Sequence, residues 1–209
     1  MTGETEATDA ERLEQLWAGD FGDAYTERNR GSIDRSEFWR TLIAAHPFAN
    51  ALEVGCNVGD NLLALSELVG AAALAGVDVN EGALATARGA LPEADLRHVA
   101  ARELPFKDGS FELVFTAMVL IHQPDETLQS VMGEIVRCSR RYVLSIEYEA
   151  SEYVDVPYRG QEGALFKRPY GALYAATFPQ LQPVVGGFLG QAEGWDDVTW
   201  SLLELQPGA

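Results

Sequence analysis

Apolar residues along the chain follow two alternating patterns. Short continuous apolar runs, which predict buried strands, lie at about 51–55, 74–79, 95–99, 111–117 and 141–147. Between several of these runs the spacing becomes that of amphipathic helices, at about 60–69, 81–90 and 126–138. Strands that alternate with helices predict an α/β fold, in which a parallel sheet carries helices on both faces.

The two ends of the chain depart from this alternation. Before the first strand, apolar positions predict a short helix near 13–17 and a longer one over Ser32–His46, which Pro47 closes. After the fifth strand comes a polar, aromatic-rich segment and then a helix near 170–178. The segments 184–191 and 197–206 flank an Ala-Glu-Gly-Trp turn, which predicts an antiparallel hairpin at the edge of the sheet.

Length and composition predict one domain over residues 1–209. The 47% of hydrophobic residues suffices for one α/β core, and no composition shift divides the chain. No apolar run approaches the length of a membrane span, and the first residues are acidic where a signal peptide would be basic, so we expect a cytoplasmic protein without membrane partners. Cys56 and Cys138 are expected to be structural, and with three scattered histidines they form no recognisable metal site.

The formal net charge of −17 argues against nucleic acid as a partner. A surface that follows phosphates needs clustered lysine and arginine, and the chain has only 15 basic residues. The acidic balance fits a well-solvated surface, so a small molecule is the expected partner.

The turn after the first strand is the strongest candidate for a ligand site. Gly55 and Gly59 permit a tight turn with no side chain between backbone and ligand, and Asn57 tolerates positive φ. The free N–H groups of the following helix point toward the same place. Asp78, 19 residues beyond Gly59, has the spacing of a carboxylate that accepts hydrogen bonds from ribose hydroxyls.

The acid just before this turn argues against a dinucleotide. Glu53 would repel a pyrophosphate, but it could orient the amino-acid end of S-adenosylmethionine, directly or through water. At this point residues 48–148 resemble the class I S-adenosylmethionine-dependent methyltransferases, through Glu53, the glycines, Asp78 and the runs 103–115 and 118–125. Asn57 replaces a common glycine, and Ala100 replaces an aspartate that accepts from the adenine amino group in many members.

The resemblance implies a Rossmann-like fold with a seven-stranded, mostly parallel sheet, and S-adenosyl-L-methionine as cofactor, with S-adenosyl-L-homocysteine as its product. The implied cofactor-binding residues are Glu53, Gly55, Cys56, Asn57, Gly59, Asp78, Val79, Ala101, Arg102, Glu103, Thr116 and Met118. The chain would then divide into N-terminal lid helices, a cofactor-binding core, an acceptor-side insertion, and a C-terminal helix with the hairpin, at 1–47, 48–147, 148–170 and 171–209.

A narrower likeness extends from about residue 17 to residue 204. The segments 21–29, 135–143, 156–160 and 165–168 are similar to the methylases associated with pseudaminic-acid biosynthesis. This likeness indicates a small-molecule pathway without fixing the acceptor atom.

Methyl transfer requires little chemistry from the protein beyond positioning, because the sulfonium is already activated. A base is needed for a hydroxyl or a protonated amine, and His122, after the fourth strand, is the first candidate. Tyr25 and Glu147 are further candidates for catalysis. The alternative for His122 is that it packs or caps the turn before Pro124.

Acceptor binding is expected from the segments that carry the narrower likeness. The candidates are Arg28, Tyr148, Tyr158, Arg159, Lys167 and Arg168. Arginine binds carboxylates through two parallel hydrogen bonds, so this set suits a sugar acid. Alternatively, these cations pair with the acids beside them in the sequence.

The sequence therefore predicts a methyltransferase for a small polar metabolite, with O-methylation of a sugar acid or related intermediate as the leading hypothesis. One alternative is N-methylation of an amine or guanidine, in which Glu147, Glu149 and Asp155 would line an anionic pocket. A third hypothesis is a non-catalytic S-adenosylmethionine-binding partner of a biosynthetic enzyme.

Overall fold

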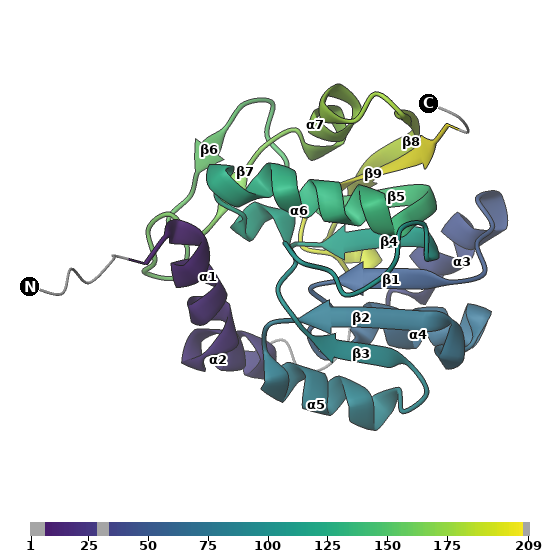
Figure 1. Cartoon of the computed structure of the whole chain (residues 1–209), viewed down its shortest axis with the longest axis horizontal. Coiled ribbons are helices and arrows are strands. Elements are labelled where there is room, and N and C mark those ends of the chain that lie inside the picture. The colour runs from purple at the N-terminus through teal and green to yellow at the C-terminus, as the bar shows by residue number, and fades with distance from the viewer. Residues whose placement is uncertain (1–6, 29–33, 207–209) are drawn as a thin grey trace, which may run out of the picture.

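One seven-stranded sheet forms the centre of the computed structural model, which describes residues 7–28 and 34–206 (Figure 1). Its strand order is β3-β2-β1-β4-β5-β9-β8. The strands are β1 (Ala51–Val54), β2 (Leu74–Asp78), β3 (Asp95–His98), β4 (Phe111–Ala117), β5 (Ser139–Glu147), β8 (Leu181–Leu189) and β9 (Val198–Leu205). The first five are parallel, while β9 runs antiparallel to β5 and pairs with β8 at the edge. The predicted fold and the terminal hairpin are thus confirmed.

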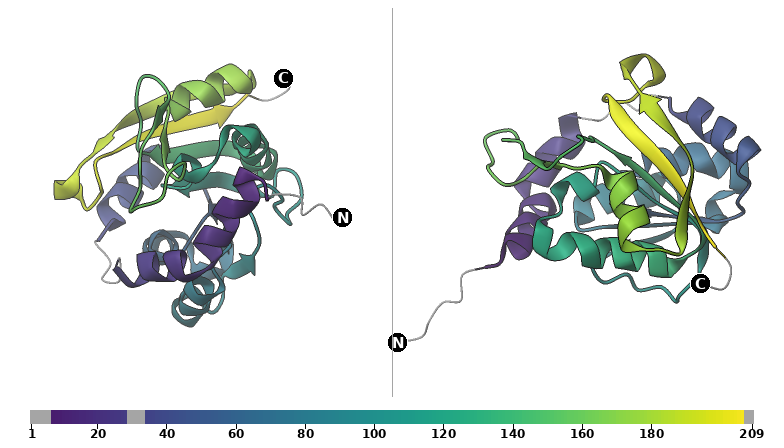
Figure 2. Two further views of the ribbon diagram at one scale, coloured as in Figure 1. Left: turned by 90° about the vertical axis from the view of Figure 1, so that its left-hand side faces the viewer. Right: turned by 90° about the horizontal axis from the view of Figure 1, so that it is seen from above.

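Helices cover both faces of the sheet (Figures 1 and 2). Buried side chains of α3 (Ser36–Ala45), α4 (Asp60–Val69) and α5 (Glu81–Ala90) join one core, and those of α6 (Asp125–Cys138) and α7 (Tyr170–Thr177) join the other. Successive strand residues alternate between the two, as Ala51 and Leu52 do. Because both faces are covered, the inner strands β1, β2 and β4 are mostly buried and largely apolar, which is why the sequence predicted them.

The order of the strands determines where a ligand can bind. β1 lies inside the sheet, with β2 on one side and β4 on the other, so the order of the strands reverses at β1. Ligands of such sheets bind outside the carboxyl ends of the strands at this reversal. The purple N-terminal helices α1 (Asp9–Ala18) and α2 (Asp20–Arg28) lie at this edge (Figure 1).

Three features differ from the sequence-based expectation or go beyond it. Helix α2 was not predicted, since its nine residues carry few apolar positions. The helix expected from Ser32 begins at Ser36, and residues 32–33 lie outside the described part. Within 148–170 the structure forms a short antiparallel pair, β6 (Val154–Asp155) and β7 (Phe166–Lys167), too short to produce a detectable alternation.

Within the described residues, three single-turn 3₁₀ helices lie in the connections: η1 (Ala71–Ala73), η2 (Leu120–His122) and η3 (Gln191–Glu193). η2 follows β4 at the carboxyl edge, and η3 lies in the turn between β8 and β9. In the parts of the chain that the structure describes, no helix combines the length and the apolar character needed to cross a membrane.

Candidate functional site

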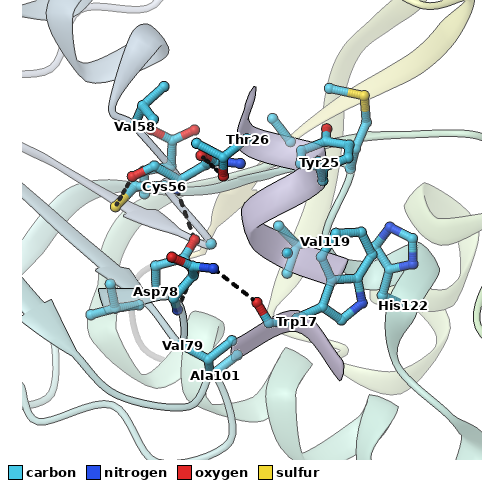
Figure 3. Close-up of a pocket in the computed structure, with 18 of the residues that line it drawn as sticks. Trp17, Tyr25, Thr26, Cys56, Val58, Asp78, Val79, Ala101, Val119 and His122 are labelled. Atoms are coloured by element: carbon cyan, nitrogen blue, oxygen red, sulfur yellow. Dashed lines mark hydrogen bonds between the residues drawn. The ribbon is translucent and has the colours of Figure 1, made fainter. Parts of the chain in front are cut away.

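A cavity of about 340 Å³ lies at the carboxyl ends of β1, β2 and β4, beneath α1 and α2 (Figure 3). The turn after β1, the end of β2 and the segment after β4 form one wall. Trp17 and Tyr25 from the N-terminal helices form part of the other, and Arg35 and Asp196 also reach it. The predicted ligand turn and the two N-terminal helices therefore share one cavity.

The turn after β1 is fixed by its backbone. Gly55 has φ 75° and Asn57 has φ 48°, in the left-handed region. The N–H groups of Gly55 and Cys56 both donate to the carbonyl of Val77, at 2.8 and 2.9 Å. A Cβ on Gly55 would lie 2.4 Å from Cγ2 of Val119, so no side chain fits there. The turn thus brings bare backbone to the cavity wall.

Asp78 holds the same turn from the end of β2. Its carboxylate accepts hydrogen bonds from the backbone N–H groups of Asn57 and Asn80, both at 2.8 Å. Burial raises the pKa of Asp78 despite these bonds. A carboxylate can accept about four hydrogen bonds, so capacity remains for ligand hydroxyls. The cap of α5 belongs to Asn80, whose side chain accepts from the N–H of Ala83 at 2.7 Å.

Glu53 is a buried carboxyl group with one oxygen unpartnered. It is 2% exposed, and its Oε1 accepts from the Nδ2 of Asn61 at 2.7 Å. Its Oε2 has no hydrogen-bond partner among the described residues. Burial raises the pKa of Glu53 to about 8. Because an unpaired buried oxygen is costly, this group is suited to a cationic or hydrogen-bonding ligand in the cavity.

Most of the other predicted cofactor residues also line the cavity. These are Gly55, Cys56, Asn57, Val79, Ala101 and Met118. Cys56 is a buried free thiol, as is Cys138 outside the site. Met118 adopts φ 59°, a conformation that costs a non-glycine residue energy and is concentrated at functional sites. Ala101, which follows the departure from the methyltransferase pattern at Ala100, also lines the cavity.

Four predicted cofactor residues are not among the lining residues. Gly59 packs toward α5, where a Cβ would lie 3.3 Å from that of Ala87. Arg102 forms an exposed ion pair with Glu14 at 2.6 Å, and Glu103 is exposed beside it. The hydroxyl of Thr116 donates to Glu147 at 2.7 Å. Their positions assign them to supporting the site, a correction to their expected contact with the cofactor.

His122 lies in the cavity wall as a neutral imidazole. Its Nδ1 is 2.6 Å from the carbonyl oxygen of Ala164, which can only accept, so Nδ1 carries the proton and Nε2 keeps a lone pair. Burial lowers the pKa of His122 to about 4. The ring lies 4.3 Å from that of Trp17, centroid to centroid, and the two rings are side by side in Figure 3. His122 is therefore available as a proton acceptor throughout the neutral range.

The expected catalytic role of Glu147 is not supported by its position. This carboxylate is fully buried and accepts from the Thr116 hydroxyl and from the N–H groups of Val119, Leu120 and Ile121. Burial raises its pKa to about 7. It is not one of the cavity residues, and its bonds fix the segment that carries His122. Glu147 is thus a structural anchor, a role that the position at the end of β5 could not reveal.

Aromatic rings form the wall of the cavity that the N-terminal helices contribute, which is the expected acceptor side. The Trp17 ring meets Phe21 and Tyr25 edge to face, each at 5.3 Å between centroids, and lies 6.5 Å from the ring of Tyr158. Burial raises the pKa of Tyr25 to about 12, so its hydroxyl stays protonated. Trp17, which the sequence placed in a helix without a functional role, is central to this wall.

Of the predicted acceptor-binding residues, Arg28 lines the cavity. Arg168 is 5% exposed and forms an ion pair with Asp125 at 2.6 Å, beneath the ring of Phe166. Lys167 lies 5.6 Å from the ring centroid of Tyr148, and Arg159 lies 5.7 Å from that of Tyr158. The residues that line the cavity do not include Tyr148, Tyr158, Arg159, Lys167 or Arg168. The cavity lining therefore contains no dense cationic group from the segment after β5, and the expected acceptor contacts of these residues stay a prediction.

Side-chain hydrogen bonds attach the N-terminal helices to the ligand turn. The hydroxyl of Thr26 donates to the Asn57 side chain at 3.0 Å, and the amide of Asn80 donates to Asp23 at 2.8 Å and to the carbonyl of Trp17 at 3.2 Å. A Cβ on Gly22 would lie 1.8 Å from the carbonyl oxygen of Trp17, so the helices approach closely. No local sequence pattern signals these long-range contacts.

Comparison with known proteins also indicates a methyltransferase. Residues 51–141 match a family model described as a methyltransferase domain. A demethylmenaquinone methyltransferase of Bacillus cereus is 29% identical over 178 residues, which cover 78% of this chain and 74% of the relative.

Solved structures that share the fold include two methyltransferases. The 1,6-didemethyltoxoflavin N1-methyltransferase of Burkholderia thailandensis, solved with 1,6-didemethyltoxoflavin and S-adenosylhomocysteine, has a TM-score of 0.74 at 14% identity, covering 98% of this chain and 93% of the other. The magnesium protoporphyrin IX methyltransferase of Synechocystis PCC 6803, solved with S-adenosylmethionine, has a TM-score of 0.69 at 12% identity, covering 98% and 100%.

Proposed function

Since the chain is a methyltransferase that uses S-adenosyl-L-methionine, we propose that it methylates an oxygen atom of a small molecule bound beside His122. The observation that carries this proposal is the neutral imidazole in the cavity wall, with Nδ1 bound to Ala164 and a lone pair on Nε2. Such a group accepts the proton that a hydroxyl loses as it is methylated.

The residues of the cofactor side fit this cofactor. The unpartnered Oε2 of Glu53 suits the ammonium of its amino-acid end, and Asp78 suits the ribose hydroxyls. When bound, the cofactor supplies a methyl group already activated by its sulfonium. The protein contributes the position of the acceptor, the exclusion of water by α1 and α2, and a proton acceptor.

The low pKa of His122 narrows the acceptors that it can serve. With a pKa of about 4 the imidazole is a weak base, so it is most effective with a hydroxyl that becomes acidic as the methyl group is transferred. The aromatic wall of Trp17 and Tyr25 would contact the body of such an acceptor.

A sugar acid remains the finer proposal for the acceptor. Arg28 supports it, because its guanidinium lines the cavity and could bind a carboxylate. The narrower likeness to methylases associated with pseudaminic-acid biosynthesis points the same way. We also propose that 1–47 acts as a lid, 48–147 as the cofactor-binding core, 148–170 as the acceptor-side insertion, and 171–209 as its C-terminal support.

N-methylation is a second candidate, which one observation favours. The carboxylates of Asp60 and Asp196 line the cavity, and neither was expected there. They would attract an amine. The structural relative from Burkholderia thailandensis is named as an N1-methyltransferase.

The test incubates the protein with S-adenosylmethionine and two matched sets of acceptors, hydroxylated sugar acids and simple amines. Formation of S-adenosylhomocysteine and of a product heavier by one methylene unit is measured by mass spectrometry. O-methylated products support the proposal, and exclusive methylation of amines replaces it with the second candidate. Failure of the protein to bind S-adenosylhomocysteine in calorimetry would remove both.

A further inference from the structure

The carboxyl group of Glu53 and the guanidinium of Arg35 lie on opposite sides of the buried amide of Asn61 in the cavity wall. The side chain of Asn61, 5% exposed, donates through Nδ2 to Glu53 at 2.7 Å. Its Oδ1 accepts from Nη1 of Arg35 at 3.4 Å. Donation to the carboxylate and acceptance from the guanidinium agree on a single orientation of the amide. Glu53, Asn61 and Arg35 thus form a row, and all three line the cavity.

Arg35 is held in position mainly by an aromatic surface. Its guanidinium carbon lies 4.2 Å from the ring centroid of Trp195, a residue that is 1% exposed. Its Nε donates to the carbonyl of Gly194 at 3.4 Å. Stacking fixes the plane of a guanidinium while leaving its edges available for hydrogen bonds. Among the described residues, the hydrogen bonds of Arg35 go to neutral oxygen atoms and are long.

The guanidinium has donors that these contacts do not use. Arginine carries five N–H donors, and a guanidinium that reaches a cavity binds carboxylates in a bidentate manner. Asp60 and Asp196 also line the cavity, so the charge of Arg35 offsets the repulsion that these acids would exert on an anionic group. Arg35 is the N-cap residue of α3 and makes no side-chain cap hydrogen bond there, so the start of the helix does not use its guanidinium.

An α-amino acid carries its ammonium and its carboxylate on one carbon atom. A site for such a group needs an anionic side chain for the ammonium and a cationic side chain for the carboxylate, a short distance apart. The row of Glu53, Asn61 and Arg35 supplies both. We propose that Arg35 binds the carboxylate of the cofactor's amino-acid end, while Glu53 takes the ammonium. This inference rests on the cofactor of the proposed function.

The test measures the contribution of the carboxylate to binding separately from that of the rest of the ligand. Calorimetry compares S-adenosylhomocysteine with S-adenosyl-3-thiopropylamine, which keeps the adenosine, the sulfur and the ammonium but lacks the carboxylate. Arg35→Met keeps a long side chain on the Trp195 ring and removes the charge. We expect it to weaken binding of S-adenosylhomocysteine roughly tenfold to a hundredfold and to change the affinity for the amine by less than about threefold.

Two matched variants define the outcome. Glu53→Gln should weaken both ligands, because both carry the ammonium. Arg40→Met removes an exposed cation from α3, the helix that Arg35 precedes, and should change neither. If Arg35→Met is unstable, Arg35→Lys retains the charge without the fork and should show a smaller loss confined to S-adenosylhomocysteine.

Equal losses for both ligands in the Arg35 variants, or no loss for either, would overturn the inference. Failure of the wild-type protein to bind S-adenosylhomocysteine is a different result. It would refute the assignment of the cofactor, on which the proposed function depends.

Discussion

The two walls of the cavity differ in where their residues come from along the chain. The cofactor side is built from turns that directly follow β1, β2 and β4, and its geometry depends on backbone hydrogen bonds such as those from Gly55 and Cys56 to Val77. The acceptor side is assembled from α1, α2 and η2, with Tyr158 of the insertion packed behind Trp17. Its geometry depends on contacts between side chains far apart in sequence.

This difference determines which substitutions each wall tolerates. A backbone-built turn tolerates almost no added atoms, because it cannot repack. A side-chain wall can change composition while the sheet stays intact, which suits a surface that selects acceptors. Variants of the two walls should therefore affect different steps of the reaction.

Gly55→Val should have the largest effect, abolishing cofactor binding. The added side chain meets Val119, and φ 75° is strained for a branched residue. Calorimetry with S-adenosylhomocysteine measures the loss. Gly70→Val is the matched control, since Gly70 has φ 83° and a Cβ added there would meet no heavy atom within 4 Å. If the Gly55 variant binds tightly, the ligand does not lie against this turn, and the contrast between the walls fails.

His122→Asn should lower kcat roughly 10²–10⁴-fold while leaving cofactor affinity near that of the wild type. Asparagine can still donate to Ala164, so it removes the base while retaining the anchor. Because the pKa of His122 is about 4, the wild-type kcat should show no inflection near the usual histidine value of about 6.5. A loss of kcat under about threefold would assign His122 to packing, and the acceptor wall would then act by position alone.

Binding of S-adenosylhomocysteine should strengthen about tenfold per pH unit between about pH 6 and pH 8. The raised pKa of Glu53, about 8, means that the free protein holds a proton there, and a bound ammonium favours the carboxylate and expels it. Low pH therefore opposes binding. Calorimetry in buffers of different ionisation enthalpy measures the released proton. Glu53→Gln should remove this part of the pH dependence, and an unchanged slope in that variant would place the titrating group elsewhere.

The smallest expected effects are on the KM of the acceptor, and they should distinguish Arg28 from Arg159. Arg28→Ala should raise the KM of an acidic acceptor about tenfold, because a charged hydrogen bond in the cavity is lost. Arg159→Ala should change it less than about twofold, since Arg159 does not line the cavity. Steady-state kinetics with one acceptor compares the two. The reverse order would return acceptor binding to the insertion, as the sequence alone suggested.

Much of the cofactor side could be predicted because its signals are local. Glu53, Gly55, Asn57 and Asp78 lie within a few residues of apolar runs that must become buried strands, and parallel strands bring their carboxyl ends to one edge. Thr116 lies at the same edge, but its buried hydroxyl donates to Glu147, while Arg102 and Glu103 face solvent. Spacing identifies the edge of the sheet without fixing the direction of every side chain.

The sequence by itself determined the fold, the edge of the sheet that holds the candidate cofactor site and the residues nearest the turn, because these follow from periodicity and backbone constraints. Only the tertiary structure decided that the Trp17 ring lies beside His122, that Arg168 forms an ion pair with Asp125, and that Arg35 donates a hydrogen bond to Asn61. The sequence around a charged or aromatic side chain does not indicate which residue that side chain will contact. Its partner depends on how distant segments pack, and that packing is a property of the whole chain.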